Sequence, residues 1–524
     1  MRKSAWLVVL FWVLAIALYL APRLSGLDLD PPREVYRGWL GAELMVEPPA
    51  KAHEARNWAL FGAFKINEAD NYQFWRAQSP AWVYPLALSF KTFGVSYATL
   101  RTTATVLGLA GLLGIVLFAH RRFGARGAAV AAVIYATEQF GIFFGRSGIL
   151  EPIVAGWCML GFCFLDRAFE RAIWLGPALL MLVVAMATKL AALPAVPVFV
   201  VFGAIAVLRA PGTEHKGRFR LILLGAIVLA IVALGIYAAS PAYVRTLVWN
   251  FQHMLFAKEG GTELDLEALD DEELGASLGQ VAKRLDRLWW MFPHTIVGAG
   301  LELGRQGWLV ARRRASLREL MPVAYFFCFV AGVLIPRHPG NRFLMLMALP
   351  LALLTLQFTF AAAKWLEERL PKVGRWAPIG FAVVFAGWGL GTFGYARVRY
   401  KHDIKDSAAL LRKHIGDRPD AVVIGLWSAP VVLETPYKHY YVKSTFNATP
   451  EALLSLAPTH TVLLGGDYTR TILREHWPEA LDRATPLATF SIRDNPLTLS
   501  EIPPVAVVRL KRSLGIRPNF LFGP

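Results

Sequence analysis

Cysteine and charged residues are scarce in this sequence. Only 3 of its 524 residues are Cys and only 18% are charged, whereas 55% are hydrophobic. Cys158, Cys163 and Cys328 all lie within long apolar runs, so neither a disulfide framework nor a thiolate metal site is indicated. The composition excludes disordered, collagen-like and disulfide-scaffold classes, and it is too apolar for a soluble enzyme of this length.

Long apolar runs dominate the chain up to residue 395. A membrane-spanning helix needs about 17 to 25 apolar residues, and eleven stretches qualify: 4–22, 97–119, 127–144, 149–165, 173–188, 190–208, 221–239, 294–311, 319–335, 343–360 and 377–395. We interpret the first as a retained helix, because its apolar run is longer than that of a signal peptide and no small-residue cleavage site follows. The sequence predicts a polytopic α-helical membrane protein with about eleven transmembrane helices.

Basic residues are distributed unevenly between the loops of this arrangement. One side holds nineteen of them: Arg2, Lys3, Arg121, Arg122, Arg126, Arg167, Arg171, Arg209, Lys216, Arg218, Arg220, Arg312, Arg313, Arg314, Arg318, Lys364, Arg369, Lys372 and Arg375. The short loops opposite hold Arg146, Lys189, Arg337 and Arg342. The positive-inside rule makes the first side cytoplasmic, so the net charge of +17 reflects topology and indicates no nucleic-acid partner.

This orientation predicts a multi-pass membrane protein with a cytoplasmic amino terminus. The absence of Cys from the predicted outer segments favours a bacterial inner membrane. Residues 1–395 are expected to form the transmembrane domain, including an outer loop at 23–96 with interfacial helices and a second outer loop at 240–293. The acidic run in the second loop fits either a solvated lid or a cation site. Residues 396–524 are expected to form a periplasmic domain.

The tail alternates helix-like and strand-like segments. Helices are predicted at 403–415, 449–456 and 469–477, and strands at 420–427, 439–445, 460–466 and 485–492. Such alternation is typical of a small soluble α/β domain. The tail contains no P-loop, no G-x-G-x-x-G and no G-x-S-x-G, so we interpret it as an accessory domain.

Polar residues gather in four places on the predicted outer side, where a membrane protein tolerates them only at a cost. They are Glu47, His53, Glu54, Arg56 and Asn57; Arg146 and Glu151; Lys189; and Arg337, His338, Asn341 and Arg342. Cations at headgroup depth suit a lipid phosphate, and a nearby carboxylate suits deprotonation of a hydroxyl.

Simpler explanations stay open for the same residues. The cations could snorkel to headgroups, Glu151 could pair with Arg146, and Glu54 fits a solvated helical face. His53 and His338 lack a second His at ligand spacing, so a zinc site is not predicted. No cofactor is required by these residues, although a divalent cation stays an open alternative.

The order of the motifs resembles a known family. AHEARNWALFGAF, SPAWVYPLALSFKTFGVSYATLR, RSGILEP, TKLAALP and PRHPGNRFLMLMALPLALL follow one another over about 1–395 as in membrane glycosyltransferases of the GT-C fold. More narrowly, the chain resembles the glycosyltransferase family 39-like group of protein O-mannosyltransferases and lipid A aminoarabinose transferase. The resemblance implies inverting transfer of a sugar from a polyprenyl phosphate to a protein, lipid or glycan acceptor on the outer face.

The resemblance also implies residue roles. Such enzymes usually carry an Asp-Glu pair as general base early in the first outer loop, where this chain has only Glu47, so Glu54 as base and a loss of catalysis stay open. Lys189 and Arg337 are expected to hold the leaving phosphate, and Glu151 with Arg146 to orient the sugar or acceptor. The catalytic candidates are Glu47 and Glu151. The remaining substrate-binding candidates are His53, Glu54, Arg56, His338 and Arg342. A non-catalytic subunit with the same fold, or a lipid or sugar transporter, is the alternative.

Overall fold

The computed structural model divides into two compact units. The described residues are 2–30, 41–67, 79–209, 217, 225, 278–334, 341–425, 427–440, 442, 449–464, 468–492, 495–504, 506, 510 and 514. The membrane unit comprises Met1–Ser25 and Ala104–Tyr395, and the second unit comprises Gly26–Thr103 and Ala396–Pro524. The predicted first outer loop therefore shares its unit with the tail.

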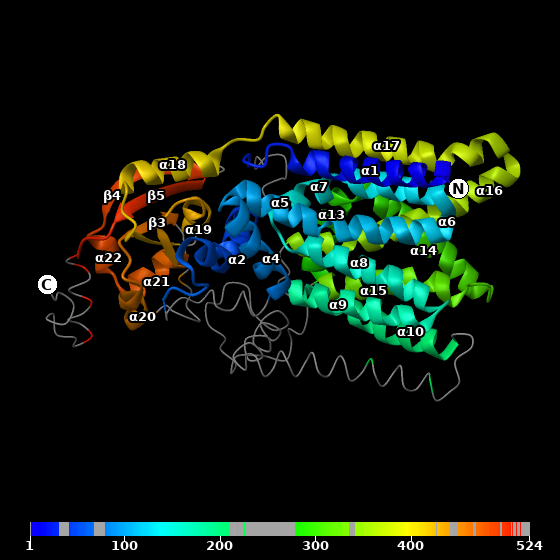
Figure 1. Cartoon of the computed structure of the whole chain (residues 1–524), viewed down its shortest axis with the longest axis horizontal. Coiled ribbons are helices and arrows are strands. Elements are labelled where there is room, and N and C mark those ends of the chain that lie inside the picture. The colour runs from blue at the N-terminus through cyan, green and yellow to red at the C-terminus, as the bar shows by residue number, and fades with distance from the viewer. Residues whose placement is uncertain are drawn as a thin grey trace. The chain divides into compact units, whose positions relative to one another are not determined.

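The membrane unit consists of helices (Figure 1). Its long elements are α1 (Arg2–Leu24), α6 (Leu109–Thr137), α7 (Gln139–Ser147), α8 (Glu151–Ala168), α9 (Leu175–Thr188), α10 (Val196–Arg209), α13 (Leu278–Met291), α14 (Pro293–Ala311), α15 (Leu317–Leu334), α16 (Ala348–Arg369) and α17 (Pro371–Arg397), preceded at α6 by α5 (Tyr97–Leu107). Ten of the eleven predicted spans coincide with these helices, and 221–239 lies outside the described residues.

Length and composition identify the chain as a multi-pass membrane protein. Within the described residues, six helical segments are long and apolar enough to cross a bilayer, or seven if the bent pair α7 and α8 forms one span. The axes of α7 and α8 differ by 113°. Arg146, near the end of α7, and Glu151, at the start of α8, therefore flank this bend.

The apolar segment Tyr97–Thr137 is a helical hairpin. Gly124 interrupts it with φ 70° and ψ −163°, which is a conformation that glycine adopts readily. Beyond the turn, a Cβ at Gly127 would lie 2.7 Å from the Ala119 carbonyl, whereas eight residues of straight helix rise about 12 Å. The Tyr135 hydroxyl likewise donates to the Gly108 carbonyl at 3.5 Å. The two arms match the separate predicted spans 97–119 and 127–144.

The second unit contains one five-stranded sheet in the order β2-β1-β3-β5-β4. The strands are β1 (Val422–Ile424), β2 (Lys438–Tyr440), β3 (His460–Leu464), β4 (Thr485–Ile492) and β5 (Asn495–Glu501). Strand β1 is parallel to β2 and β3, whereas β5 is antiparallel to β3 and β4. The first four strands overlap the predicted ones, whereas β5 was not predicted.

Helices complete the second unit around this sheet. They are α2 (Gly41–Phe61), α4 (Pro80–Phe93), α18 (Asp403–Ile415), α19 (Ser428–Val432), α20 (Pro450–Leu456), α21 (Tyr468–His476) and α22 (Glu479–Asp482). One core contains the buried Trp477 with Ile424, Leu453 and Leu473 from strand and helices. Helix α2 contacts both α4 and α19, so it lies inside the unit and buries charged side chains.

Candidate active site

An ion-paired group stands at the first residue of α8. The Glu151 carboxylate oxygen Oε1 accepts from Lys189 Nζ at 2.5 Å and from Arg342 Nε at 3.1 Å. Glu151 is fully buried, while the Lys189 and Arg342 side chains are 17% and 18% exposed. The Phe343 ring lies beneath both cations, 4.7 Å from Lys189 Nζ and 5.3 Å from the Arg342 guanidinium carbon. The group therefore combines a buried anion with two cations that reach the surface.

The ends of helices and 3-10 segments position these three side chains. Gly148 ends α7 in the left-handed conformation with φ 89°, and α8 then begins at Glu151, where a helix N-terminus favours a carboxylate. Lys189 is an extended residue between α9 and the 3-10 helix η3 (Leu190–Ala195). Arg342 lies at the start of the 3-10 helix η6 (Asn341–Met347). Each charge thus sits at a helix end.

The other predicted residues of the membrane unit lie near these in sequence. Arg146 is 3% exposed in the last turn of α7, five residues before Glu151. Arg337 and His338 lie outside the described residues, so their proximity to Lys189 stays a prediction. The acidic run of the loop 240–293 also lies outside the described residues.

In the second unit, α2 carries the first predicted group. Glu47 forms an i,i+4 ion pair with Lys51, and their side chains are 16% and 2% exposed. Lys51 was not a predicted site residue, although its spacing from Glu47 on a helix is the usual one for such a pair. The Glu47 side chain is therefore mostly buried, and its carboxylate oxygen Oε2 is fully buried.

The expectation that Glu54 lies on a solvated helical face is wrong. The expected solvated side chain is fully buried, because α2 has protein on more than one side. Arg56 is also buried and donates to the backbone carbonyls of Val432, Leu433, Thr435 and Tyr437. Burial lowers the pKa of Arg56 to about 9, which leaves it cationic at neutral pH. Arg56 thus holds the loop between α19 and β2 against α2.

His53 joins α2 to strand β2. The Asn57 amide Nδ2 donates to the Phe64 carbonyl at 3.4 Å and faces His53 Nε2 at 3.0 Å, so His53 Nε2 is the acceptor. A neutral His53 then carries its proton on Nδ1 and donates to His439 Nδ1, 3.1 Å away. His439 in turn carries its proton on Nε2. Both rings are buried, and the sequence gives no local signal that pairs residues 53 and 439.

This histidine pair predicts a pH-dependent stability. Burial, followed by electrostatic interactions with His53 and Arg56, holds the pKa of His439 well below its usual value. The unfolded chain takes up a proton below about pH 6.5 while folded His439 resists it, so the free energy of unfolding should fall by about 1.4 kcal/mol per pH unit there. Denaturation of the full chain and of His439→Gln at pH 7.5 and 5.5 measures this. Equal losses in both proteins would contradict the assignment.

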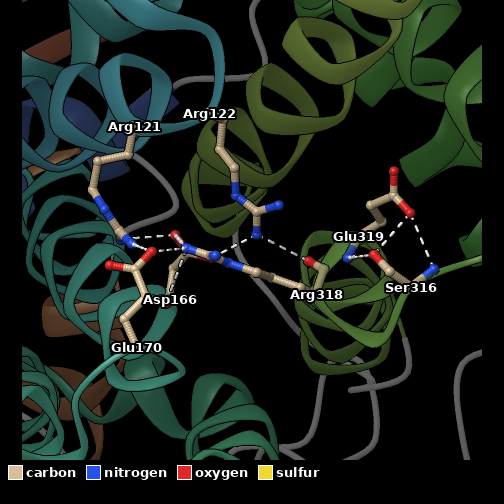
Figure 2. Close-up of polar contacts among 7 residues, drawn as sticks. All are labelled: Arg121, Arg122, Asp166, Glu170, Ser316, Arg318 and Glu319. Carbon is tan, nitrogen blue, oxygen red and sulfur yellow. Dashed lines mark hydrogen bonds and ion pairs between the residues drawn. The ribbon is translucent and has the colours of Figure 1, made fainter. Parts of the chain in front are cut away.

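A second charged group, not predicted from the sequence, surrounds Asp166. Its buried carboxylate accepts from Arg121 at 2.8 Å, from Arg122 at 2.5 Å and from Arg318 at 2.8 Å. Figure 2 shows the three guanidinium groups converging on Asp166, with Glu170 beside them. These residues join α6, α8 and α15, and Asp166 stands about 22 Å from Glu151 along α8. The sequence signal was an acidic residue directly after the apolar run 149–165.

The described residues contain no group of three or more His, Cys, Asp or Glu side chains placed to hold a metal ion. A pair such as His53 and His439 falls short of the usual four-ligand set of a structural zinc site. The Glu151 group brings together two cations and one carboxylate, and its excess positive charge suits an anionic ligand.

The chain is a multi-pass membrane protein with the GT-C fold. Two solved structures share it: ArnT from Cupriavidus metallidurans bound to undecaprenyl phosphate, with TM-score 0.59, and the same protein in the apo state, with TM-score 0.57. Each is 14% identical to this chain; the alignments cover 96% and 97% of this chain and 99% of each ArnT chain.

ArnT is the lipid A aminoarabinose transferase, a GT-C protein. The likeness confirms the fold that the sequence resemblance predicts, and at this identity it concerns the fold alone. No protein-family profile matches the sequence, and no curated protein sequence matches it.

Proposed function

We propose that this protein is an inverting glycosyltransferase that moves a sugar from a polyprenyl-phosphate carrier to an acceptor on the outer face of the membrane. The observation that carries the proposal is the group of Glu151, Lys189 and Arg342, with the buried Arg146 close in sequence. Three cations against one carboxylate favour an anion such as a phosphate ester. The shared fold with an ArnT crystallised with undecaprenyl phosphate supports a lipid carrier.

Each candidate residue has a specific role in this reaction. Lys189 and Arg342, with Arg337, hold the leaving phosphate, and their charges stabilise the negative charge that develops as the sugar departs. Arg146 orients the sugar, and Glu47 accepts the proton of the acceptor hydroxyl. His53, Glu54 and Arg56 act indirectly in this proposal, since their burial within the second unit suits positioning of α2. His338 stays a candidate for substrate binding.

The proposed orientation places the amino terminus in the cytoplasm and residues 396–524 outside. It is supported by the nineteen-to-four distribution of basic loop residues. Alkaline phosphatase folds to its active form only outside the cytoplasm, so fusing it after Pro524 in a bacterial host should give an active enzyme. A full-length but inactive fusion would reverse the orientation.

Sugar transfer by the purified full chain tests the activity itself. In detergent with a panel of radiolabelled polyprenyl-phosphate sugars and an envelope extract as acceptor, we expect label to move from one donor into the extract. Lys189→Ala should weaken donor binding by about 10- to 100-fold, the range for losing a hydrogen bond to a charged group. Lys372→Ala, an exposed lysine on α17, is the matched control and should bind normally.

This chain has only Glu47 where related enzymes usually carry an Asp-Glu pair. A non-catalytic subunit with the GT-C fold is therefore the second candidate function. The same assay separates the two. A well-folded protein that binds polyprenyl-phosphate sugars but transfers none of them would favour the subunit.

A further inference from the structure

Glu151 occupies an unusual place for a residue of a phosphate-binding group. One of its oxygens, Oε1, is shared by Lys189 Nζ and Arg342 Nε, which come from segments 38 and 191 residues away. The carboxylate is fully buried, whereas both cations remain about one sixth exposed. The anion thus lies on the inner side of its two cations.

Glu151 Oε1 accepts hydrogen bonds from an ammonium and a guanidinium group, and a phosphate oxygen could occupy the same position. Carboxylate and phosphate oxygens accept the same charge-assisted hydrogen bonds from Lys and Arg. Lys189 and Arg342 converge although they carry like charges, because the carboxylate between them supplies the opposite charge. A phosphate that reaches both cations therefore meets Glu151 as a competitor of the same sign.

We propose that Glu151 is an internal counter-ion. In the absence of substrate its carboxylate pairs with Lys189 and Arg342, and the incoming phosphate displaces it from both cations. This rests on the proposed function, which places the carrier phosphate at these two cations. A buried carboxylate that gives up these two cations is stabilised by a further hydrogen-bond donor, and a sugar hydroxyl is one.

The consequence is a preference for the loaded carrier. A polyprenyl-phosphate sugar brings hydroxyl groups that the displaced carboxylate can accept from, and its phosphodiester carries one negative charge. The spent carrier brings no sugar hydroxyl and more negative charge, so the Glu151 carboxylate repels it more strongly. Glu151 thereby assists release of the product lipid.

The test is the affinity of the full chain in detergent for undecaprenyl phosphate, with inorganic phosphate as the ligand that lacks the lipid. Glu151→Gln removes the competing charge and should tighten binding of both ligands by roughly 10-fold, the size of a one-unit shift caused by a neighbouring charge. Equal or weaker binding of both ligands by Glu151→Gln overturns the inference, because Glu151 would then support the phosphate site.

Lys189→Ala separates this inference from the function on which it rests. If Lys189→Ala weakens lipid-phosphate binding and Glu151→Gln does not strengthen it, the inference fails while the phosphate site stands. If Lys189→Ala changes nothing, the phosphate binds elsewhere and the proposed function fails too.

A measurement on the unaltered protein covers the case in which Glu151→Gln does not fold. Infrared difference spectra on adding undecaprenyl phosphate should show a shifted carboxylate stretch as Glu151 leaves its two cations. An unchanged carboxylate region at saturating lipid would overturn the inference.

Discussion

Glu47→Gln is expected to lower sugar transfer by about 10²- to 10⁴-fold, the contribution typical of a positioned general base. Glutamine keeps the shape and hydrogen-bonding capacity of Glu47 but cannot take the acceptor proton. The side chain is 16% exposed and paired with Lys51, so the ion pair fixes the position of the carboxylate. Turnover and donor affinity are measured separately, and affinity should change little because the base acts on the acceptor.

The control for this substitution is Glu475→Gln. Glu475 belongs to the same unit and its side chain is 69% exposed, so its loss should leave transfer unchanged. Glu54→Gln is unsuitable as a neutral control, because Glu54 is fully buried and the change alters the interior of the unit. Full turnover in Glu47→Gln would move the base to another carboxylate, with Glu151 the first to examine.

Asp166→Asn is expected to lower the free energy of unfolding by about 3–5 kcal/mol, the cost of removing one partner from a buried ion pair. The change leaves Arg121, Arg122 and Arg318 converging without the buried negative charge that brings α6, α8 and α15 together. Denaturation in mixed detergent and sodium dodecyl sulfate micelles, followed by circular dichroism, measures the loss.

Glu170→Gln is the matched control for Asp166. Glu170 contacts two of the same guanidinium groups, those of Arg121 and Arg318, at 2.7 Å and 3.0 Å, but its side chain is 55% exposed. Exposed ion pairs contribute about 1 kcal/mol or less. Similar losses for both variants would show that burial of Asp166 does not set the strength of this group.

Local signals explain why much of the secondary structure is predictable. The helix predicted at 403–415 is α18 to the residue, with Asp403 and Asp406 in its first turn, basic residues in its last and Gly416 beyond it at φ 71°. Membrane helices follow equally from composition, because a bilayer demands long apolar segments with internal hydrogen bonding. Strand β5 was missed because the run NPLTLSE begins with the turn residues Asn and Pro.

The sequence by itself determined the apolar spans, most of the strands and helices, and the candidates Glu47, Glu151 and Lys189, because these depend on composition and spacing along one segment. Only the tertiary structure decided which charges meet. Glu151 pairs with Arg342 across 191 residues, and His53 meets His439 across 386. It also buried Glu54 and gathered three arginines around Asp166. The sequence around a charged helical residue is the same whether its side chain faces water, lipid or another charge. Only packing between distant segments distinguishes these surroundings.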